Sequence, residues 1–259
     1  MKDFTVATYE KILKAFIRAG YKIVSVSEYL KNDNYEKALI LRHDIDRYIR
    51  QVPPIIELET RLGISASYYV RYIPSLFQHW LLEIIVKNGH ELGYHYEVLS
   101  QTARANPSLK NTELIDKAYA AFKNNLEEYK EYYPIQTITM HGDSLSKQNN
   151  LDLWEHHDYR ELGIICEPYL DIDFSNIGYI TDVGRAWNKA SVNRRDLING
   201  LPISVTGSND LIDKIFNNEL PALIMMNMHP EHWTDSNIRW LQLYMIRMVK
   251  NNLKRAFFK

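Results

Sequence analysis

The 259-residue sequence lacks several features that mark secreted, membrane and nucleic-acid-binding proteins. It contains a single cysteine, Cys166, which excludes an internal disulfide and is expected to pack as a small apolar side chain. No run of about 18 apolar residues occurs, so we expect no stable membrane span. The net charge of -1 provides no global basic field for binding nucleic acid.

Other absences bear on domain organisation and location. The sequence has no Pro/Gly-rich linker, no internal repeat and no low-complexity tract. Its first ten residues lack the apolar core of a signal peptide. The hydrophobic content of 46% is enough for one large core. We therefore predict a single cytoplasmic domain spanning residues 1–259, with no prediction of its oligomeric state.

Apolar segments typical of strands alternate with amphipathic segments typical of helices. Such alternation predicts an α/β fold in which a parallel sheet is covered by helices. About seven strand–helix units in this length suit a closed or nearly closed barrel. The predicted strands are 21–26, 38–43, 65–71, 91–95, 136–141, 164–167, 179–182, 203–206 and 222–228, and the main predicted helices are 8–19, 52–62, 78–88, 112–132, 151–161, 209–218 and 236–254.

Four of the predicted strands end in polar runs that contain histidine. One such histidine is more often a structural hydrogen-bonding residue than a ligand. Four at the carboxyl ends of parallel strands would converge on one mouth of a barrel, where α/β enzymes place their chemistry. The runs are Arg-His-Asp-Ile-Asp at 42–46, Gly-His-Glu-Leu-Gly-Tyr-His-Tyr-Glu at 89–97, Thr-Ile-Thr-Met-His-Gly-Asp at 137–143 and Met-Asn-Met-His-Pro-Glu-His-Trp at 226–233.

These residue types suit metal-dependent hydrolysis. Histidine nitrogen and aspartate oxygen bind zinc and similar divalent ions, and a bound ion activates water. Asp44 and Asp46 are two positions apart, so one can bind the metal while the other acts as a base. The alternative is that both carboxylates only form ion pairs with Arg42, Arg47 or Arg50.

On these motifs the sequence resembles the NodB-type polysaccharide deacetylases, carbohydrate esterase family 4. The resemblance runs from about residue 38 to residue 233. It implies a distorted (β/α)7 barrel and a divalent metal that assists removal of acyl groups from N-acetylated sugars. By the same resemblance, Asp44 is the general base, Asp46 and His95 are metal ligands, and His229 is the general acid. The run 181–187 is similar to the motif that tunes this acid, which includes Asp182, Arg185 and Trp187.

The sequence also departs from the family pattern. The second metal-binding histidine of the family would stand four residues after His95, where this chain has Leu99. Either Glu97 or His141 is the candidate replacement, and the family's Arg-x-Pro element is not apparent. The opening Arg-His-Asp-x-Asp is similar to a divergent branch that is often linked to surface-polysaccharide synthesis.

The sequence therefore predicts a hydrolase that removes an N-acetyl or other N-acyl group from a sugar precursor of capsule or O-antigen. Two alternatives remain open: a metal-free amide or ureide hydrolase on the same fold, and a non-catalytic sugar-binding protein. The expected metal is Zn²⁺, with Asp46, His95 and His141 as ligands and Asp44 and His229 as catalytic residues. The candidate substrate-binding residues are Arg42, Glu97, Asp182, Arg185, Trp187, His232 and Trp233.

Overall fold

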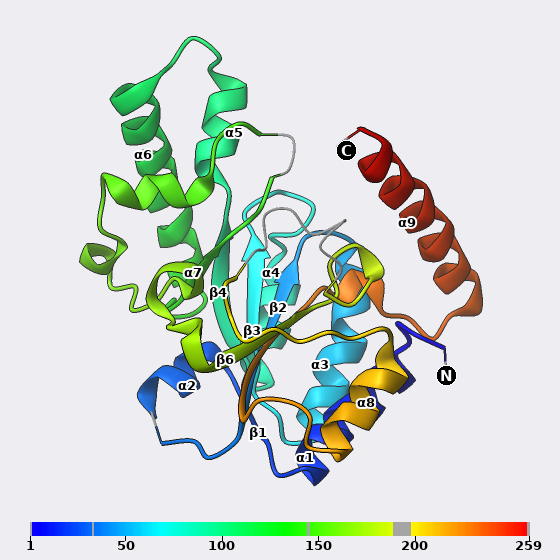
Figure 1. The fold of residues 1–259 in the computed structure, drawn as a ribbon. Helices are drawn as coiled ribbons and strands as arrows, with labels where there is room; N and C mark the ends of the chain where they lie inside the picture. The colour runs from blue at the N-terminus through cyan, green and yellow to red at the C-terminus, as the bar shows by residue number, and fades with distance from the viewer. Residues whose placement is uncertain (1, 33, 144–145, 189–197, 258–259) are drawn as a thin grey trace.

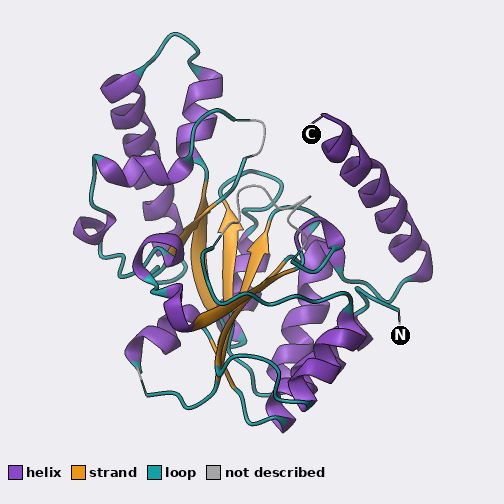
Figure 2. Cartoon of the chain, in the orientation of Figure 1, coloured by secondary structure: helices purple, strands orange, loops and turns teal. Residues whose placement is uncertain are grey.

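A curved sheet of parallel strands forms the centre of the protein, and helices cover it (Figures 1 and 2). The computed structural model describes residues 2–32, 34–143, 146–188 and 198–257, with residues 251–257 as backbone only. The seven strands within these residues are β1 (Lys22–Val24), β2 (Ala38–Ile45), β3 (Ser67–Arg71), β4 (Glu91–Tyr96), β5 (Ile138–Met140), β6 (Ile177–Thr181) and β7 (Leu223–Met228).

The order of the strands confirms the predicted α/β class. All paired strands are parallel, and the order across the sheet is β5-β4-β3-β2-β7-β6. The short strand β1 pairs with the first half of β2, on the side where β3 pairs with its second half. Every residue of β2 is buried, as expected for a central parallel strand covered on both faces. Among the described strands, β5 and β6 form the two edges, so the wall of the barrel is open between them.

Two predicted elements differ from the structure at these edges. The segment 164–167 contributes only a single bridge, between Cys166 and Thr137 of the chain leading into β5. The segment 203–206 forms no strand, because pairing next to β6 stops at the bridge between Gly178 and Leu201. Pro202 follows immediately and has no N–H to continue a ladder.

The helices follow from local sequence signals. In α1 (Val6–Arg18), the Thr5 side chain accepts a hydrogen bond from Thr8 N, and the apolar face of the helix is buried. The predicted helix 151–161 instead divides into two 3-10 helices, Asn150–Glu155 and Tyr159–Leu162, because the Asp158 side chain starts a new turn. The other helices are α2 (Val26–Lys31), α3 (Val52–Arg61), α4 (His79–Lys87), α5 (Val98–Ala105), α6 (Asn111–Lys130), α7 (Pro168–Asp171), α8 (Ser208–Phe216) and α9 (Asn237–Phe257).

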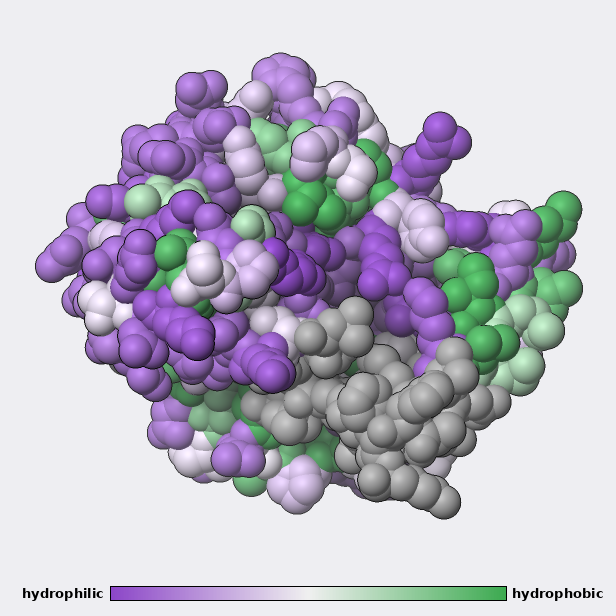
Figure 3. All heavy atoms as spheres, turned by 90° about the horizontal axis from the view of Figure 1, so that it is seen from above, coloured by the Kyte–Doolittle hydropathy of each residue, from purple (hydrophilic) through white to green (hydrophobic). Residues whose placement is uncertain are grey.

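The last helix, α9, stands beside the rest of the protein (Figure 1). Several of its apolar side chains are exposed, among them Ile238, Leu241 and Val249. The space-filling view shows apolar side chains at its right-hand edge, where α9 lies (Figure 3). No helix in the described part of the chain is long and apolar enough to cross a bilayer.

The carboxyl ends of the strands bring the polar runs together. His95 lies near the end of β4, and Asp46, His141, Asp182 and His229 directly follow β2, β5, β6 and β7. Because these strands are parallel, all five residues lie at the same end of the sheet, where the strands finish. The convergence predicted from the sequence is therefore present.

A buried carboxylate ties the sheet to two helices on the other face of β2. Glu59 of α3 accepts hydrogen bonds from Tyr9 of α1 at 2.5 Å and from Tyr68 of β3 at 2.7 Å. His43 Nε2 lies 2.7 Å from Glu59 Oε1. Burial opposes ionisation of Glu59, but His43, His90 and Tyr9 together outweigh it and lower the pKa of this carboxyl. His43 thus has a structural role, although it belongs to the motif that contains Asp44 and Asp46.

We predict that Glu59→Gln lowers the free energy of unfolding by about 3 kcal/mol, because a neutral amide replaces a buried carboxylate that has three hydrogen-bonding partners. Chemical denaturation measures this change. Glu57→Gln is the matched control, since Glu57 lies exposed on the same helix. Equal stability of the two variants would contradict the structural role of Glu59.

Candidate metal centre and active site

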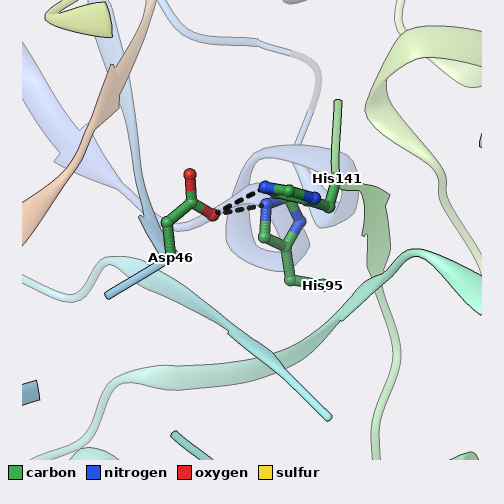
Figure 4. A group of neighbouring side chains, drawn as sticks. All are labelled: Asp46, His95 and His141. Atoms are coloured by element: carbon green, nitrogen blue, oxygen red, sulfur yellow. Dashed lines mark ion pairs between the residues drawn. The ribbon is translucent and has the colours of Figure 1, made fainter. Parts of the chain in front are cut away.

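Asp46, His95 and His141 form a cluster of ligand-type side chains at the strand ends (Figure 4). Asp46 Oδ1 lies 3.3 Å from His95 Nε2 and 3.5 Å from His141 Nε2. Ligand atoms around a tetrahedral zinc ion lie about 3.3 Å apart, given bonds of about 2.0–2.1 Å. The three ligand atoms all lie within 4.8 Å of one another, and the two spacings from Asp46 Oδ1 match those around one divalent ion.

The hydrogen bonds behind the two imidazoles orient them toward the cluster. His95 Nδ1 lies 3.0 Å from the carbonyl oxygen of Thr139, and His141 Nδ1 lies 2.9 Å from Glu97 Oε2. Both acceptors select the tautomer with hydrogen on Nδ1, so each ring offers the lone pair of Nε2. Metal-binding histidines in proteins are oriented in this way.

Glu97 lies behind His141 and is itself held by one guanidinium and one amide. Its Oε1 accepts hydrogen bonds from Arg71 at 2.5 Å and from Gln101 at 2.6 Å. Burial opposes its ionisation, but His141 and Arg71 outweigh this and lower the pKa of Glu97 to about 2. Of the two candidates for the third ligand, His141 lies in the cluster and Glu97 orients it.

The electrostatics of the cluster favour a cation. Asp46 Oδ1 is buried and accepts no hydrogen bond from the residues that the structure describes. Burial opposes charging of His141, yet Asp46 and Glu97 outweigh it and raise the pKa of His141 to about 9. The two carboxylates therefore attract positive charge, which either a proton or a metal ion supplies. The donor set of two imidazole nitrogens and one carboxylate oxygen fits zinc.

Asp44 lies next to this cluster, on the same face of β2 as Arg42. Its Oδ2 is 2.8 Å from Arg42 Nη2, accepts a 2.9 Å hydrogen bond from Asn227, and lies 3.9 Å from His95 Nε2. Burial opposes ionisation of Asp44, but Arg42, His95 and His229 outweigh it and lower its pKa. Asp44 is thus a carboxylate at neutral pH, and its buried Oδ1 accepts no hydrogen bond from any described residue.

A second group of buried side chains surrounds Asp182, at the ends of β6 and β7. His229 Nδ1 lies 2.6 Å from Asp182 Oδ1, and the Trp233 indole donates to Asp182 Oδ2 at 2.7 Å. Burial opposes charging of His229, but Asp182 outweighs it and raises the pKa of His229 to about 10. His229 therefore carries a proton at neutral pH, as the general-acid prediction requires.

Asp182, His229 and His232 are also close enough to resemble a metal site. Their hydrogen bonds favour a different role. Asp182 already accepts from the indole of Trp233 and from the backbone N–H of His229, at 3.1 Å for its Oδ1. His232 Nε2 lies 2.6 Å from the Arg247 guanidinium, which occupies its lone pair. These contacts leave Asp182 as the partner that favours the protonated form of His229.

All seven candidate substrate-binding residues are buried. Arg42 is fully buried against Asp44 and Tyr169. Arg185 donates to the carbonyl oxygens of His232 and Trp240. Glu97 lies behind His141, Asp182 beside His229, and His232 and Trp233 around Asp182. Trp187 instead donates a hydrogen bond to Ser208 of α8.

Three further residues join the site that the sequence analysis did not single out. Arg71 ends β3 and bonds Glu97, and Asn227 of β7 donates to Asp44. Glu231 is buried next to His229, and burial together with the charge of Asp46 raises its pKa to about 8. Each stands at a strand end or in a polar run, so the signal that marked the histidines applies to these residues too.

No protein-family model matches the chain, and no curated protein matches it. Among solved structures it is similar to a candidate polysaccharide deacetylase involved in O-antigen biosynthesis from Bordetella bronchiseptica, with 16% identity, coverage of 95% of this chain and 92% of that one, and a TM-score of 0.46. It is similar to a CE4 esterase from Streptococcus mutans, with 13% identity, coverage of 90% and 89%, and a TM-score of 0.45. A CE4 family pseudoenzyme from Bacillus anthracis shares 12% identity, with coverage of 85% and 63% and a TM-score of 0.40.

These structures carry the names of the group that the sequence motifs resemble.

We predict that Asp46→Ala, His95→Ala and His141→Ala each lose stoichiometric divalent metal, because each removes one of three ligand atoms. Glu97→Gln is expected to weaken metal affinity by roughly 10–100-fold, since Glu97 orients a ligand without being one. Elemental analysis and competition with a metal chelator measure both effects.

His157→Ala is the matched control, because the His157 ring stacks on Tyr119 and lies 3.1 Å from Asp116, outside the cluster. Full metal content in the Asp46→Ala or His95→Ala protein would contradict the ligand assignment. Complete loss of metal in the Glu97→Gln protein would make Glu97 a ligand.

Proposed function

We propose that this protein is a metal-dependent hydrolase that removes an N-acetyl or other N-acyl group from a sugar precursor in surface-polysaccharide biosynthesis. The observation that carries the proposal is the convergence of Asp46 Oδ1 with the Nε2 atoms of His95 and His141. Asp44 lies beside this cluster, and the protonated His229 lies close enough for its charge to lower the pKa of Asp44.

In this proposal Asp46, His95 and His141 bind the divalent ion, and zinc suits their donor atoms. The bound ion would supply Lewis acidity, which lowers the pKa of a water molecule and polarises the acyl carbonyl. Glu97 and the Thr139 carbonyl keep the two imidazoles in the orientation that binding requires.

Asp44 and His229 divide the proton transfers between them. Asp44 is ionised and has one free buried oxygen, so it accepts the proton of the attacking water. The water oxygen bonds to the acyl carbon, and the bond between that carbon and the sugar nitrogen breaks. His229 gives its proton to the departing nitrogen, so the products are a carboxylic acid and a free amino sugar.

We predict that Asp44→Asn keeps its metal but loses at least about 100-fold in turnover, because the amide cannot accept the proton. The assay follows acetate release from N-acetylated sugars beside the metal content of each protein. Asp213→Asn is the control, since Asp213 lies exposed on α8. Unchanged turnover in the Asp44→Asn protein would remove Asp44 as the base.

Chelation separates this proposal from the two alternative functions. Acetate release that survives exhaustive chelation would favour a metal-free amide hydrolase. Sugar binding without metal and without hydrolysis would favour a binding protein.

We predict that Asp182→Asn moves the alkaline loss of turnover to lower pH by about 1–3 units. His229 donates only while protonated, and the Asp182 carboxylate keeps its pKa near 10. Removing that charge lowers the pKa of His229, so deprotonation begins at lower pH. A pH profile of kcat measures the shift, and an unchanged alkaline limb would exclude His229 as the acid that Asp182 tunes.

A further inference from the structure

A pocket of about 870 Å³ adjoins the metal centre at Asp46. Its charged lining consists of that aspartate and four arginines: Arg47 and Arg50 after β2, Arg71 at the end of β3, and Arg239 of α9. The volume lies in the range of small-molecule sites. Because Asp46 belongs to both the pocket and the metal cluster, a ligand in the pocket would reach the reacting centre.

The arginines of this pocket exceed the acidic groups that face them. Arg71 is occupied by Glu97 and by the backbone oxygen of Asp46. Arg47, Arg50 and Arg239 form no ion pair with any carboxylate in the described part of the chain. Unpaired guanidinium groups that share a pocket repel one another, so a bound anion would relieve an unfavourable arrangement.

The local backbone fixes the position of this charge. Tyr48 lies between Arg47 and the short 3-10 helix Ile49–Gln51, with a φ of 50° that side chains rarely adopt. The guanidinium of Arg239 lies 4.6 Å from the centroid of the Tyr48 ring, in a cation–π contact. A strained residue that supports a cationic side chain beside a reacting centre indicates a functional constraint on this segment.

We propose that this pocket binds the phosphoryl group of a phosphate or diphosphate ester of the N-acylated sugar. The inference rests on the proposed function, which places the acyl group at Asp46. Guanidinium groups bind phosphate oxygens through paired, charge-assisted hydrogen bonds. A neutral polysaccharide chain would leave Arg47 and Arg50 without an anionic partner. The substrate is therefore an activated sugar rather than a finished neutral polymer.

The phosphate can come from two sources, a nucleotide or a lipid. Arg239 belongs to α9, whose apolar side chains Ile238 and Leu241 are exposed, so both sources have to be tested. Calorimetric titration of the chelator-treated protein with UDP-N-acetylglucosamine tests the first. Co-sedimentation with vesicles that carry a polyprenyl-diphosphate N-acetylglucosamine tests the second. N-acetylglucosamine is the neutral reference, with plain vesicles for the second arm.

We expect at least one phosphorylated probe to bind at least tenfold more tightly than its neutral reference. Arg47→Ala and Arg50→Ala should each remove most of this preference and leave binding of the neutral sugar unchanged. Arg18→Ala is the matched control, because Arg18 is an exposed arginine at the end of α1. The preference should also fall as salt rises, since it depends on exposed charges.

Equal affinity for neutral and phosphorylated probes, or a preference that survives both arginine variants, would overturn the proposal. Equally tight, arginine-dependent binding of N-acetylmuramic acid would also overturn it, because the pocket would then select a carboxylate. These measurements need neither metal nor turnover. Phosphate-dependent binding without acetate release would contradict only the proposed hydrolysis, and release from neutral sugars without phosphate preference would contradict only this inference.

Discussion

The hydrogen bond between Glu97 and His141 Nδ1 determines the arrangement of the centre. It leaves Nε2 as the atom that faces Asp46, and it holds negative charge behind the ring. Arg71 and Gln101 fix the carboxylate in turn, so β3 and α5 together orient a side chain that follows β5. Without this chain of contacts His141 would be one more polar residue at a strand end.

Side chains alternate along β2, so its buried polar residues lie on two opposite faces of the sheet. Arg42 and Asp44 face the candidate active site, whereas His43 faces Glu59 on the opposite side of the sheet. Burying ionisable groups on both faces of one strand is costly unless each has a partner. Here Arg42 pairs with Asp44, and His43 contacts Glu59. These contacts offset the free-energy cost of burial and also hold Asp44 in position.

The order of the strands separates the aspartates of the site from His229. Asp44 and Asp46 follow the central strand β2, the two candidate imidazole ligands lie toward β4 and β5, and His229 lies toward β7. Asp182 raises the pKa of His229, while Arg42 lowers that of Asp44. Environments that push two pKa values in opposite directions are what acid–base catalysis at neutral pH needs. The arginine pocket extends this division outward from Asp46.

The sequence by itself determined the α/β class, most of the strands and the convergence of the polar runs, because apolar periodicity and parallel pairing are regular along the chain. It did not determine two irregular segments. Residues 151–161 divide into two short helices because Asp158 caps the second one, and residues 203–206 form no strand because Pro202 precedes them. It predicted His141 as the third ligand but left Glu97 open as the alternative. Only the tertiary structure distinguishes their positions: His141 Nε2 faces Asp46, whereas Glu97 lies behind the His141 ring. That placement depends on Arg71 and Gln101, which belong to other elements.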